Sequence, residues 1–316
     1  MNDSYFEYVG NGLYCYANSM AMLLVGIGED IKPALIEVLT GISLGVKLNK
    51  EDNLLRFNIH QLLPDLGLTK ALTLLGFTYE TKVFEDKDDF PKDELKEDLK
   101  LSPAVIGPLD MGYLTYNPRH KYLKGADHYV LGYKIENDLL YLHDPENFPN
   151  VFLSMYKLKE AWQANGISYK KGYYRYITNL RRTEKPREEQ IYRKAVRFFK
   201  ENYLISEEFQ ESSKFELGSD ALVKYSKYVK ENGLNENDVK WYIYFALPLG
   251  AKRANDYAVY FRNFDQKLSE LKFVQSQIFG SLHCYAVAGN WKKLAVGFEK
   301  LARNENEFKE WVVKNY

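Results

Sequence analysis

The stretch Asn11-Gly-Leu-Tyr-Cys15-Tyr-Ala-Asn-Ser-Met20 decides how the rest of the chain is interpreted. A glycine-containing loop leads directly into a cysteine, and apolar residues then recur at steps of three or four residues, at Ala17, Met20, Ala21 and Leu24. This spacing predicts a helix with Cys15 in its first turn. The free backbone N–H groups and the helix dipole favour negative charge there, so a thiol in that position ionises more readily than a free cysteine. Cys15 is therefore a candidate nucleophile.

Composition bounds the kind of protein. The 316 residues are 46% apolar and 27% charged, which is enough for a large core and suggests two domains. Lysine plus arginine and aspartate plus glutamate each number 43, so the charge balance favours neither nucleic acid nor an anionic membrane as a partner. No apolar run is long enough for a membrane span, and the polar, acidic N-terminus lacks a signal-peptide pattern. We therefore expect a cytoplasmic protein.

Cysteine and histidine usage points away from disulfides and metals. The chain has two cysteines, Cys15 and Cys284, and five scattered histidines. Two cysteines do not make a disulfide framework, and no pair has the spacing of zinc ligands. We expect no bound metal and no cofactor.

The first half of the chain reads as mixed helix and strand. Short apolar or alternating runs predict strands at 77–84, 103–110, 151–153 and 173–178. A hairpin is expected from the arms 128–133 and 139–144 around a turn at 136–138, and an aromatic loop covers 111–124. Arg181 to Pro186 is polar and reads as a linker.

Beyond this linker the chain reads as almost entirely helical. We expect helices at about 188–202, 219–232, 238–246, 255–272, 273–289 and 291–301. The sequence therefore predicts an α+β protein with an N-terminal domain, 1–182, that holds an antiparallel sheet, and an α-helical domain, 187–316.

The hairpin brings a base and a carboxylate together. If it folds about 136–138, His128 lies opposite roughly Asp144 to Glu146, where cross-strand side chains touch. His128 and Asp144 then form a base and the group that orients it, although a register slip of one residue would turn one side chain to the other face. Set against Cys15, they complete a Cys-His-Asp triad.

An acyl-transfer site also needs donors for the oxyanion. The backbone N–H of Cys15 is one natural donor. Asn11 is the nearest side-chain amide before the cysteine, and Asn18 and Tyr14 are weaker candidates. In the aromatic loop, Tyr113, Tyr116 and His120 are candidate substrate contacts, together with Tyr14.

Each of these residues also has a structural interpretation. A lone cysteine beside alanine and methionine is often a small buried hydrophobe, and a histidine at the start of an apolar strand is often structural. The order of a helix-initiating cysteine, a strand histidine and an aspartate on the next strand favours catalysis.

Several ordered motifs resemble the BtrH N-terminal family, whose namesake is a butirosin-biosynthesis acyltransferase. They are the stretch from Cys15 to Leu24, residues 39–45, residues 109–116, Asp127-His128-Tyr-Val-Leu-Gly-Tyr133 and His143-Asp144-Pro145. The resemblance implies a papain-like fold with Cys15 as nucleophile, His128 as base and Asp144 as orienting residue. Papain-like peptidases usually carry a glutamine several residues before the cysteine. This chain has Tyr8, Val9 and Asn11 in that region and no glutamine.

The resemblance implies acyl transfer from a carrier-protein thioester to an amine through an acyl-enzyme. The expected partners are an acyl carrier protein or CoA-like donor and a small amine acceptor, with a homodimer as the commonest assembly. A cysteine peptidase or amidase would use the same chemistry with water as acceptor. A binding protein on the same fold is the non-catalytic alternative. The aromatic loop and the helical domain are expected to wall the pocket.

Overall fold

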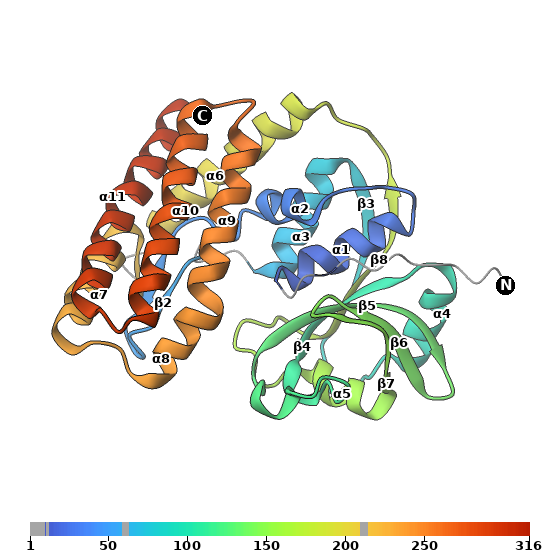
Figure 1. The fold of residues 1–316 in the computed structure, drawn as a ribbon. Helices are drawn as coiled ribbons and strands as arrows, with labels where there is room; N and C mark the ends of the chain where they lie inside the picture. The colour runs from blue at the N-terminus through green and yellow to red at the C-terminus, as the bar shows by residue number, and fades with distance from the viewer. Residues whose placement is uncertain (1–9, 11–12, 59–62, 209–213) are drawn as a thin grey trace. The chain divides into compact units, whose positions relative to one another are not determined.

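The computed structural model describes residues 10, 13–58, 63–208 and 214–316. The chain forms two compact units, one from residues 1–36 and 68–185 and the other from 37–67 and 186–316. An antiparallel sheet dominates the first unit, and helices dominate the second (Figure 1), which confirms the α+β class. Within the described ranges, no helix is both long and apolar enough to cross a membrane.

The first unit is built on a six-stranded antiparallel sheet in the order β3-β8-β4-β5-β6-β7. Its strands are β3 (Phe77–Phe84), β4 (Ala104–Asp110), β5 (Asp127–Glu136), β6 (Leu139–Asp144), β7 (Phe148–Ser154) and β8 (Tyr173–Arg182). Its helices are α1 (Cys15–Val25), α4 (Lys92–Leu101), η1 (Met111–Tyr113), η2 (His120–Tyr122) and α5 (Met155–Gln163). The boundaries between the units fall within α2 (Pro33–Thr40) and α3 (Pro64–Leu75). Each strand expected from the sequence belongs to this sheet.

The hairpin of β5 and β6 forms because its two turn residues accept positive φ angles. Asn137 and Asp138 have φ of 50° and 63°, a conformation that these short polar side chains tolerate and that tight hairpins need. The turn pairs Glu136 with Leu139 and so sets the register. Helix α1 packs against β4 and β5, which brings the start of α1 to the strand that carries His128.

The described residues of the second unit form mostly helices and a small sheet. Its helices are α6 (Glu188–Glu208), α7 (Gly218–Asn232), α8 (Glu236–Trp241), the π-helix η3 (Tyr242–Ala246), α9 (Leu247–Phe261), α10 (Gln266–Val287) and α11 (Trp291–Asn315). Its three short strands, in the antiparallel order β2-β1-β9, are β1 (Lys47–Asn49), β2 (Leu55–Arg56) and β9 (Phe215–Leu217).

Residues 37–67 belong to the helical unit, whereas the sequence placed them in the first domain. Strand β1 pairs with β9, and Val46, Leu48 and Leu55 are buried in the helical core. The hydroxyl of Tyr242 donates to the carbonyl of Leu55 and accepts from its N–H, both at 3.2 Å. These contacts join positions almost 190 residues apart, which local sequence patterns do not reveal.

The break between the last long helices differs from its expected position. The sequence placed it at 272/273, but Lys272 and Phe273 lie inside α10. The helix starts at Gln266 because the Asp265 side chain accepts the backbone N–H of Leu268 at 2.9 Å and caps the first turn. Apolar spacing alone did not reveal this capping residue.

Candidate active site

Helix α1 begins at Cys15, as the sequence predicts. The residue before it, Tyr14, has φ of 61° and ψ of 48°, a left-handed conformation that is unfavourable for a bulky side chain. This turn brings the chain sharply into the helix and puts Cys15 at its first position. There its backbone N–H has no acceptor within the helix.

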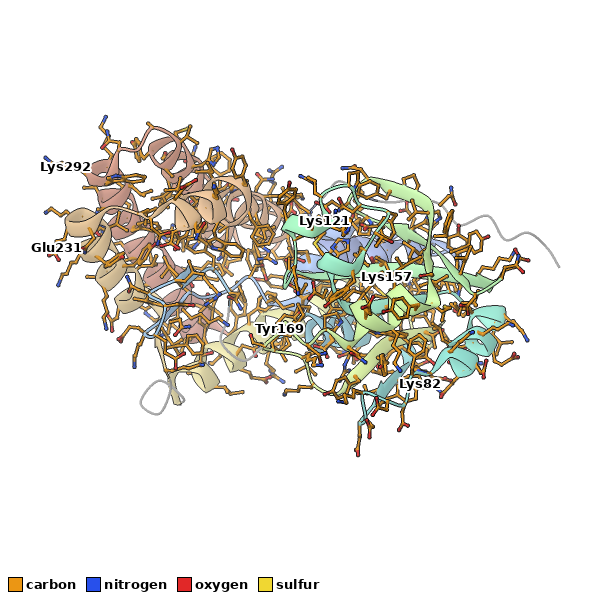
Figure 2. All side chains as sticks on the ribbon, turned by 90° about the horizontal axis from the view of Figure 1, so that it is seen from below. Lys82, Lys121, Lys157, Tyr169, Glu231 and Lys292 are labelled. Carbon is orange, nitrogen blue, oxygen red and sulfur yellow. The ribbon has the colours of Figure 1, made fainter. Side chains whose placement is uncertain are left out.

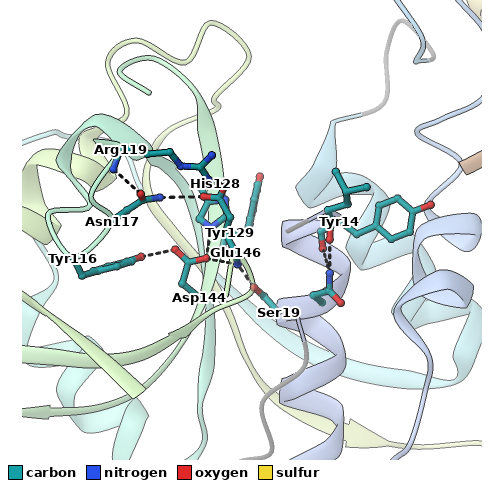
Figure 3. Close-up of polar contacts among 11 residues, drawn as sticks. Tyr14, Ser19, Tyr116, Asn117, Arg119, His128, Tyr129, Asp144 and Glu146 are labelled. Atoms are coloured by element: carbon teal, nitrogen blue, oxygen red, sulfur yellow. Dashed lines mark hydrogen bonds and ion pairs between the residues drawn. The ribbon is translucent and has the colours of Figure 1, made fainter. Parts of the chain in front are cut away.

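His128 and Asp144 are directly hydrogen-bonded. His128 Nε2 donates to Asp144 Oδ1 at 2.7 Å (Figure 3), and both side chains are buried. The hairpin register brings them together, since Leu131 pairs with His143 one residue before Asp144. His143 lies on the other side of the strand, where its Nδ1 accepts the backbone N–H of Asn150 at 3.0 Å.

The Cys15 side chain lies close enough to His128 to act on the pKa of its imidazole. Because Nε2 is bonded to Asp144, the ring nitrogen available to the thiol is Nδ1. Burial alone would lower the pKa of His128, but the Asp144 charge and hydrogen bond, together with Cys15, raise this pKa well above its ordinary value. The structure therefore assembles all three residues of the expected triad within the first unit.

Asp144 is held in its charged form. Burial would raise its pKa, but His128, the backbone N–H of Glu146 and the hydroxyl of Tyr116 together lower it. The Glu146 N–H reaches Oδ1 at 2.7 Å, and the Tyr116 hydroxyl donates to Oδ2 at 2.8 Å. A buried carboxylate with donors on both oxygens keeps a fixed orientation toward the imidazole.

The loop that carries Tyr116 is anchored to the turn after β6. The Glu146 carboxylate accepts Asn117 Nδ2 at 3.1 Å and Arg119 Nη2 at 2.9 Å (Figure 3). Asn117 is fully buried, and its Oδ1 accepts the backbone N–H of Arg119 at 2.9 Å. The aromatic loop is thus fixed to the same turn that orients Asp144.

The oxyanion candidates have different outcomes. Asn11 lies outside the described residues. Asn18 is buried, and its Nδ2 donates to the carbonyls of Leu13 and, at 3.1 Å, of Tyr14. Both amide hydrogens therefore brace the loop before Cys15, so we remove Asn18 from the oxyanion candidates. The backbone N–H of Cys15 and the side chain of Asn11 stay predicted oxyanion donors.

The expected substrate contacts also differ from one another. Tyr14 is buried and its ring points away from His128 (Figure 3), and Tyr116 is engaged with Asp144, so neither stays a substrate candidate. Tyr113 is half-buried beside Lys157, whose Nζ lies 5.9 Å from its ring centre. His120 is half-buried, and its Nδ1 bonds to the carbonyl of Asn117 at 2.8 Å. Tyr113 and His120 stay predicted substrate contacts.

Tyr169 is a neighbour of the site that sequence reasoning missed. It lies on the segment after α5 (Figure 2), and its hydroxyl donates to Oδ2 of Asp127 at 2.7 Å. Burial and the nearby Tyr129 and Asp127 raise its pKa well above the ordinary value. No motif marks this residue, because the contact depends on how the loop returns to the start of β5.

Among the residues that the structure describes, no three histidine, cysteine, aspartate or glutamate side chains are grouped to hold a metal ion. The site itself brings together a thiol, an imidazole and a carboxylate at a helix N-terminus. That set suits nucleophilic attack on an acyl carbon.

Comparison with known proteins finds a matching domain model and a similar bacterial protein. The model of the YobF C-terminal domain matches residues 212–313, which lie in the helical unit. A Bacillus subtilis (strain 168) protein described as "Uncharacterized protein YobF" is 39% identical over 307 residues, which cover 97% of this chain and 98% of that protein. The second match covers nearly the whole chain and so extends over both units.

Proposed function

The chain belongs to the YobF family, and we propose from the geometry of its site that it is a cysteine-dependent acyltransferase. It would move an acyl group from a thioester to an amine through an acyl-enzyme on Cys15. The observation that carries this proposal is the buried hydrogen bond from His128 Nε2 to Asp144 at 2.7 Å, with Cys15 close enough to His128 to act on its pKa. Resemblance to the BtrH N-terminal family and to papain-like enzymes supports the same chemistry.

In the proposed first step, His128 Nδ1 takes the proton of Cys15 and the sulfur attacks the thioester carbonyl. The N–H at the start of α1 stabilises the oxyanion. The donor thiolate leaves and takes a proton, so the acyl group is now bonded to Cys15. Asp144 stabilises the imidazolium without taking its proton.

In the second step, an amine attacks the acyl-enzyme. His128 accepts a proton from the amine as the new amide bond forms, and Cys15 is released as a thiol after proton return. Water in place of the amine would give a hydrolase, which is the alternative function. The acyl-enzyme is common to both reactions, so the preference between amine and water distinguishes them.

The proposal includes a cellular location, an acyl donor and an oligomeric state for the enzyme. A free catalytic thiol suits a reducing cytoplasm, and a carrier protein or CoA-like molecule suits the role of acyl donor. Size-exclusion chromatography with light scattering would test the predicted homodimer.

The first test measures the rate of Cys15 alkylation by iodoacetamide against pH. We expect reactivity to persist well below the free-thiol pKa of about 8.5, and the His128→Ala variant to lose it. The measurement uses the Cys284→Ala background, because Cys284 is exposed and would react as well. An inert Cys15, or one that titrates like a free thiol with or without His128, would contradict the proposal.

The second test looks for the acyl-enzyme. Incubation with an acyl-CoA should add the mass of the acyl group to the Cys284→Ala protein but not to the same protein carrying Cys15→Ala. Addition of primary amines should then give amides faster than water gives the free acid. Faster release to water would assign the hydrolase instead.

A further inference from the structure

We infer that Tyr116 is a positioning residue for the Cys15–His128 pair and acts through Asp144. This inference rests on the proposed function and adds a fourth residue to its machinery. Tyr116 comes from the loop after η1, and its hydroxyl donates to Asp144 Oδ2 at 2.8 Å on the side away from the His128 contact (Figure 3).

The two oxygens of Asp144 have different roles. Oδ1 accepts from His128 Nε2 and from the backbone N–H of Glu146, both at 2.7 Å. Oδ2 accepts from Tyr116, and the carboxylate is fully buried. Rotation of the carboxyl group would break these bonds in a place that water does not reach. Tyr116 therefore fixes the plane of the carboxylate and with it the direction of the imidazole.

Tyr116 is itself held in place by the neighbouring structure. Its ring packs edge-to-face on Phe148, with ring centres 5.8 Å apart. The next residue, Asn117, is fully buried and bonded to Glu146, which also pairs with Arg119. The turn that supplies an N–H to Asp144 thus also anchors the loop that supplies the hydroxyl. A tyrosine held in this way has a defined position relative to the carboxylate.

The charges around Asp144 set the sign of the expected effect. It faces His128 from β5, Tyr116 from the aromatic loop and the backbone N–H of Glu146 from its own turn, and the Glu146 carboxylate is paired with Arg119. The Tyr116 donor stabilises the charged form of Asp144. Its removal should let Asp144 take a proton at higher pH, and the imidazolium–thiolate pair would then be lost at higher pH as well.

The experiment is the pH profile of Cys15 alkylation by iodoacetamide in Tyr116→Phe, with Cys284→Ala as background in every variant. We expect the acid-side midpoint to move up by about one pH unit, so that the rate below the midpoint falls about tenfold. Tyr122→Phe is the matched control, because Tyr122 lies in the same loop, is 89% exposed and makes no hydrogen bond through its hydroxyl with the described residues. Its midpoint should equal that of the background.

A purely structural role of Tyr116 would lower stability and leave the midpoint unchanged, which would overturn the inference. The double variant Tyr116→Phe with Asp144→Asn sharpens the test, because a residue that acts through Asp144 adds no further shift once the carboxylate is gone. An additional shift in the double variant would also overturn it. If Tyr116→Phe does not fold, Phe148→Leu is the substitute, because it loosens the packing on the Tyr116 ring. This variant should shift the midpoint of Cys15 alkylation in the same direction by a smaller amount. An unchanged midpoint in Phe148→Leu would overturn the inference.

Failure of this inference and failure of the proposed function look different. An unshifted Tyr116→Phe profile beside a low-pH reactivity that depends on His128 removes Tyr116 only. A Cys15 that titrates like a free thiol in the unmodified protein removes the function itself.

Discussion

Each unit of this protein contains a pair of opposite charges that is almost completely buried, and these two pairs differ in how they meet. In the sheet unit, His128 Nε2 and Asp144 Oδ1 lie 2.7 Å apart and share a hydrogen bond. In the helical unit, Lys272 Nζ and Glu305 Oε2 lie 4.0 Å apart, and Lys272 donates to Gln275 instead. Both pairs are almost completely buried.

The pKa values of the two buried cations, His128 and Lys272, shift in opposite directions. Direct contact with Asp144 overcomes the effect of burial and raises the pKa of His128 well above its ordinary value. For Lys272, burial outweighs the more distant Glu305 and lowers its pKa to about 8. Glu305 accepts from Tyr203 and Gln275, each at 2.8 Å, so its charge is already satisfied. A buried cation is favoured only where its partner touches it.

Among the substitutions that test this comparison, removal of Asp144 should change the free energy of unfolding most. Asp144→Ala leaves His128 buried without its counter-ion, and breaking a buried pair in this way typically costs about 3–5 kcal/mol. Urea unfolding at pH 6, where His128 would otherwise be charged, measures the loss. Glu305→Gln is the comparison, since it keeps an acceptor for Tyr203, and its loss should be smaller. Equal losses would mean that direct contact does not distinguish the two pairs.

Replacement of Lys272 should instead increase the free energy of unfolding. Lys272→Met keeps the side-chain length and removes a charge that burial penalises, so the free energy of unfolding at pH 7 should rise by about 1–3 kcal/mol. Because the folded-state pKa of about 8 lies below the ordinary 10.5, the unfolded chain binds more protons between these values, and stability should rise with pH across that range. Lys272→Met should reduce this rise, and the remainder is expected from Lys47, whose pKa burial also lowers to about 8.

Chemical unfolding between pH 7 and 10.5 checks both effects of that variant. Lys292→Met, on the exposed face of α11, is the matched control and should change neither stability nor slope. A destabilised Lys272→Met would show that the ammonium contributes more through Gln275 and the Phe308 ring, 3.9 Å away, than its burial costs.

His128 should make the free energy of unfolding fall with pH, over a lower pH range than the rise caused by Lys272. Its raised pKa means that its contribution to stability is complete below about pH 6.5 and declines as the pH rises through the folded-state value. One proton corresponds to at most about 1.4 kcal/mol per pH unit. The difference in unfolding free energy between Lys272→Met and Lys272→Met with His128→Gln, measured from pH 6 to 8, gives this slope, because Lys47 contributes equally to both. A difference that stays constant over this range would assign the slope to another group.

The smallest effects should come from two buried serines. Ser19 donates to the carbonyl of Tyr129 at 3.1 Å, and Ser226 donates to the carbonyl of Ala295 at 2.9 Å. Replacement of either by alanine should cost about 1 kcal/mol, because one buried carbonyl loses its donor. Only Ser19→Ala should also slow Cys15 alkylation, since Ser19 joins α1 to β5. An equal change in both variants would mean that thiol reactivity follows overall stability.

Sequence predicted the parts of this molecule that depend on neighbouring residues. The start of α1 at Cys15 followed from apolar spacing, and the hairpin followed from Asn137 and Asp138 at its turn. That hairpin then fixed His128 against Asp144 across 16 residues. The His128–Asp144 pair could therefore be predicted, because one short hairpin holds both residues.

Sequence did not predict contacts between distant segments. The pairing of β1 with β9 and the bond from Tyr242 to Leu55 join segments that carry no shared pattern. The role of Tyr116 was likewise hidden, because a loop tyrosine looks the same whether it faces substrate or a carboxylate. Asn18 was misjudged because helix-start amides often serve the chain before them, as its bonds to Leu13 and Tyr14 do.

The discontinuous helical unit has a consequence for how the protein is made. Residues 37–67 leave the ribosome first, but their partners in 186–316 follow only after the whole of 68–185 has been synthesised. By the end of that interval the sheet unit has all of its residues, while Val46, Leu48 and Leu55 still have no core to enter. The nascent chain therefore carries an exposed apolar segment early in translation. We expect ribosome-bound chains ending near residue 200 to be more susceptible to protease between residues 37 and 67 than between 104 and 182.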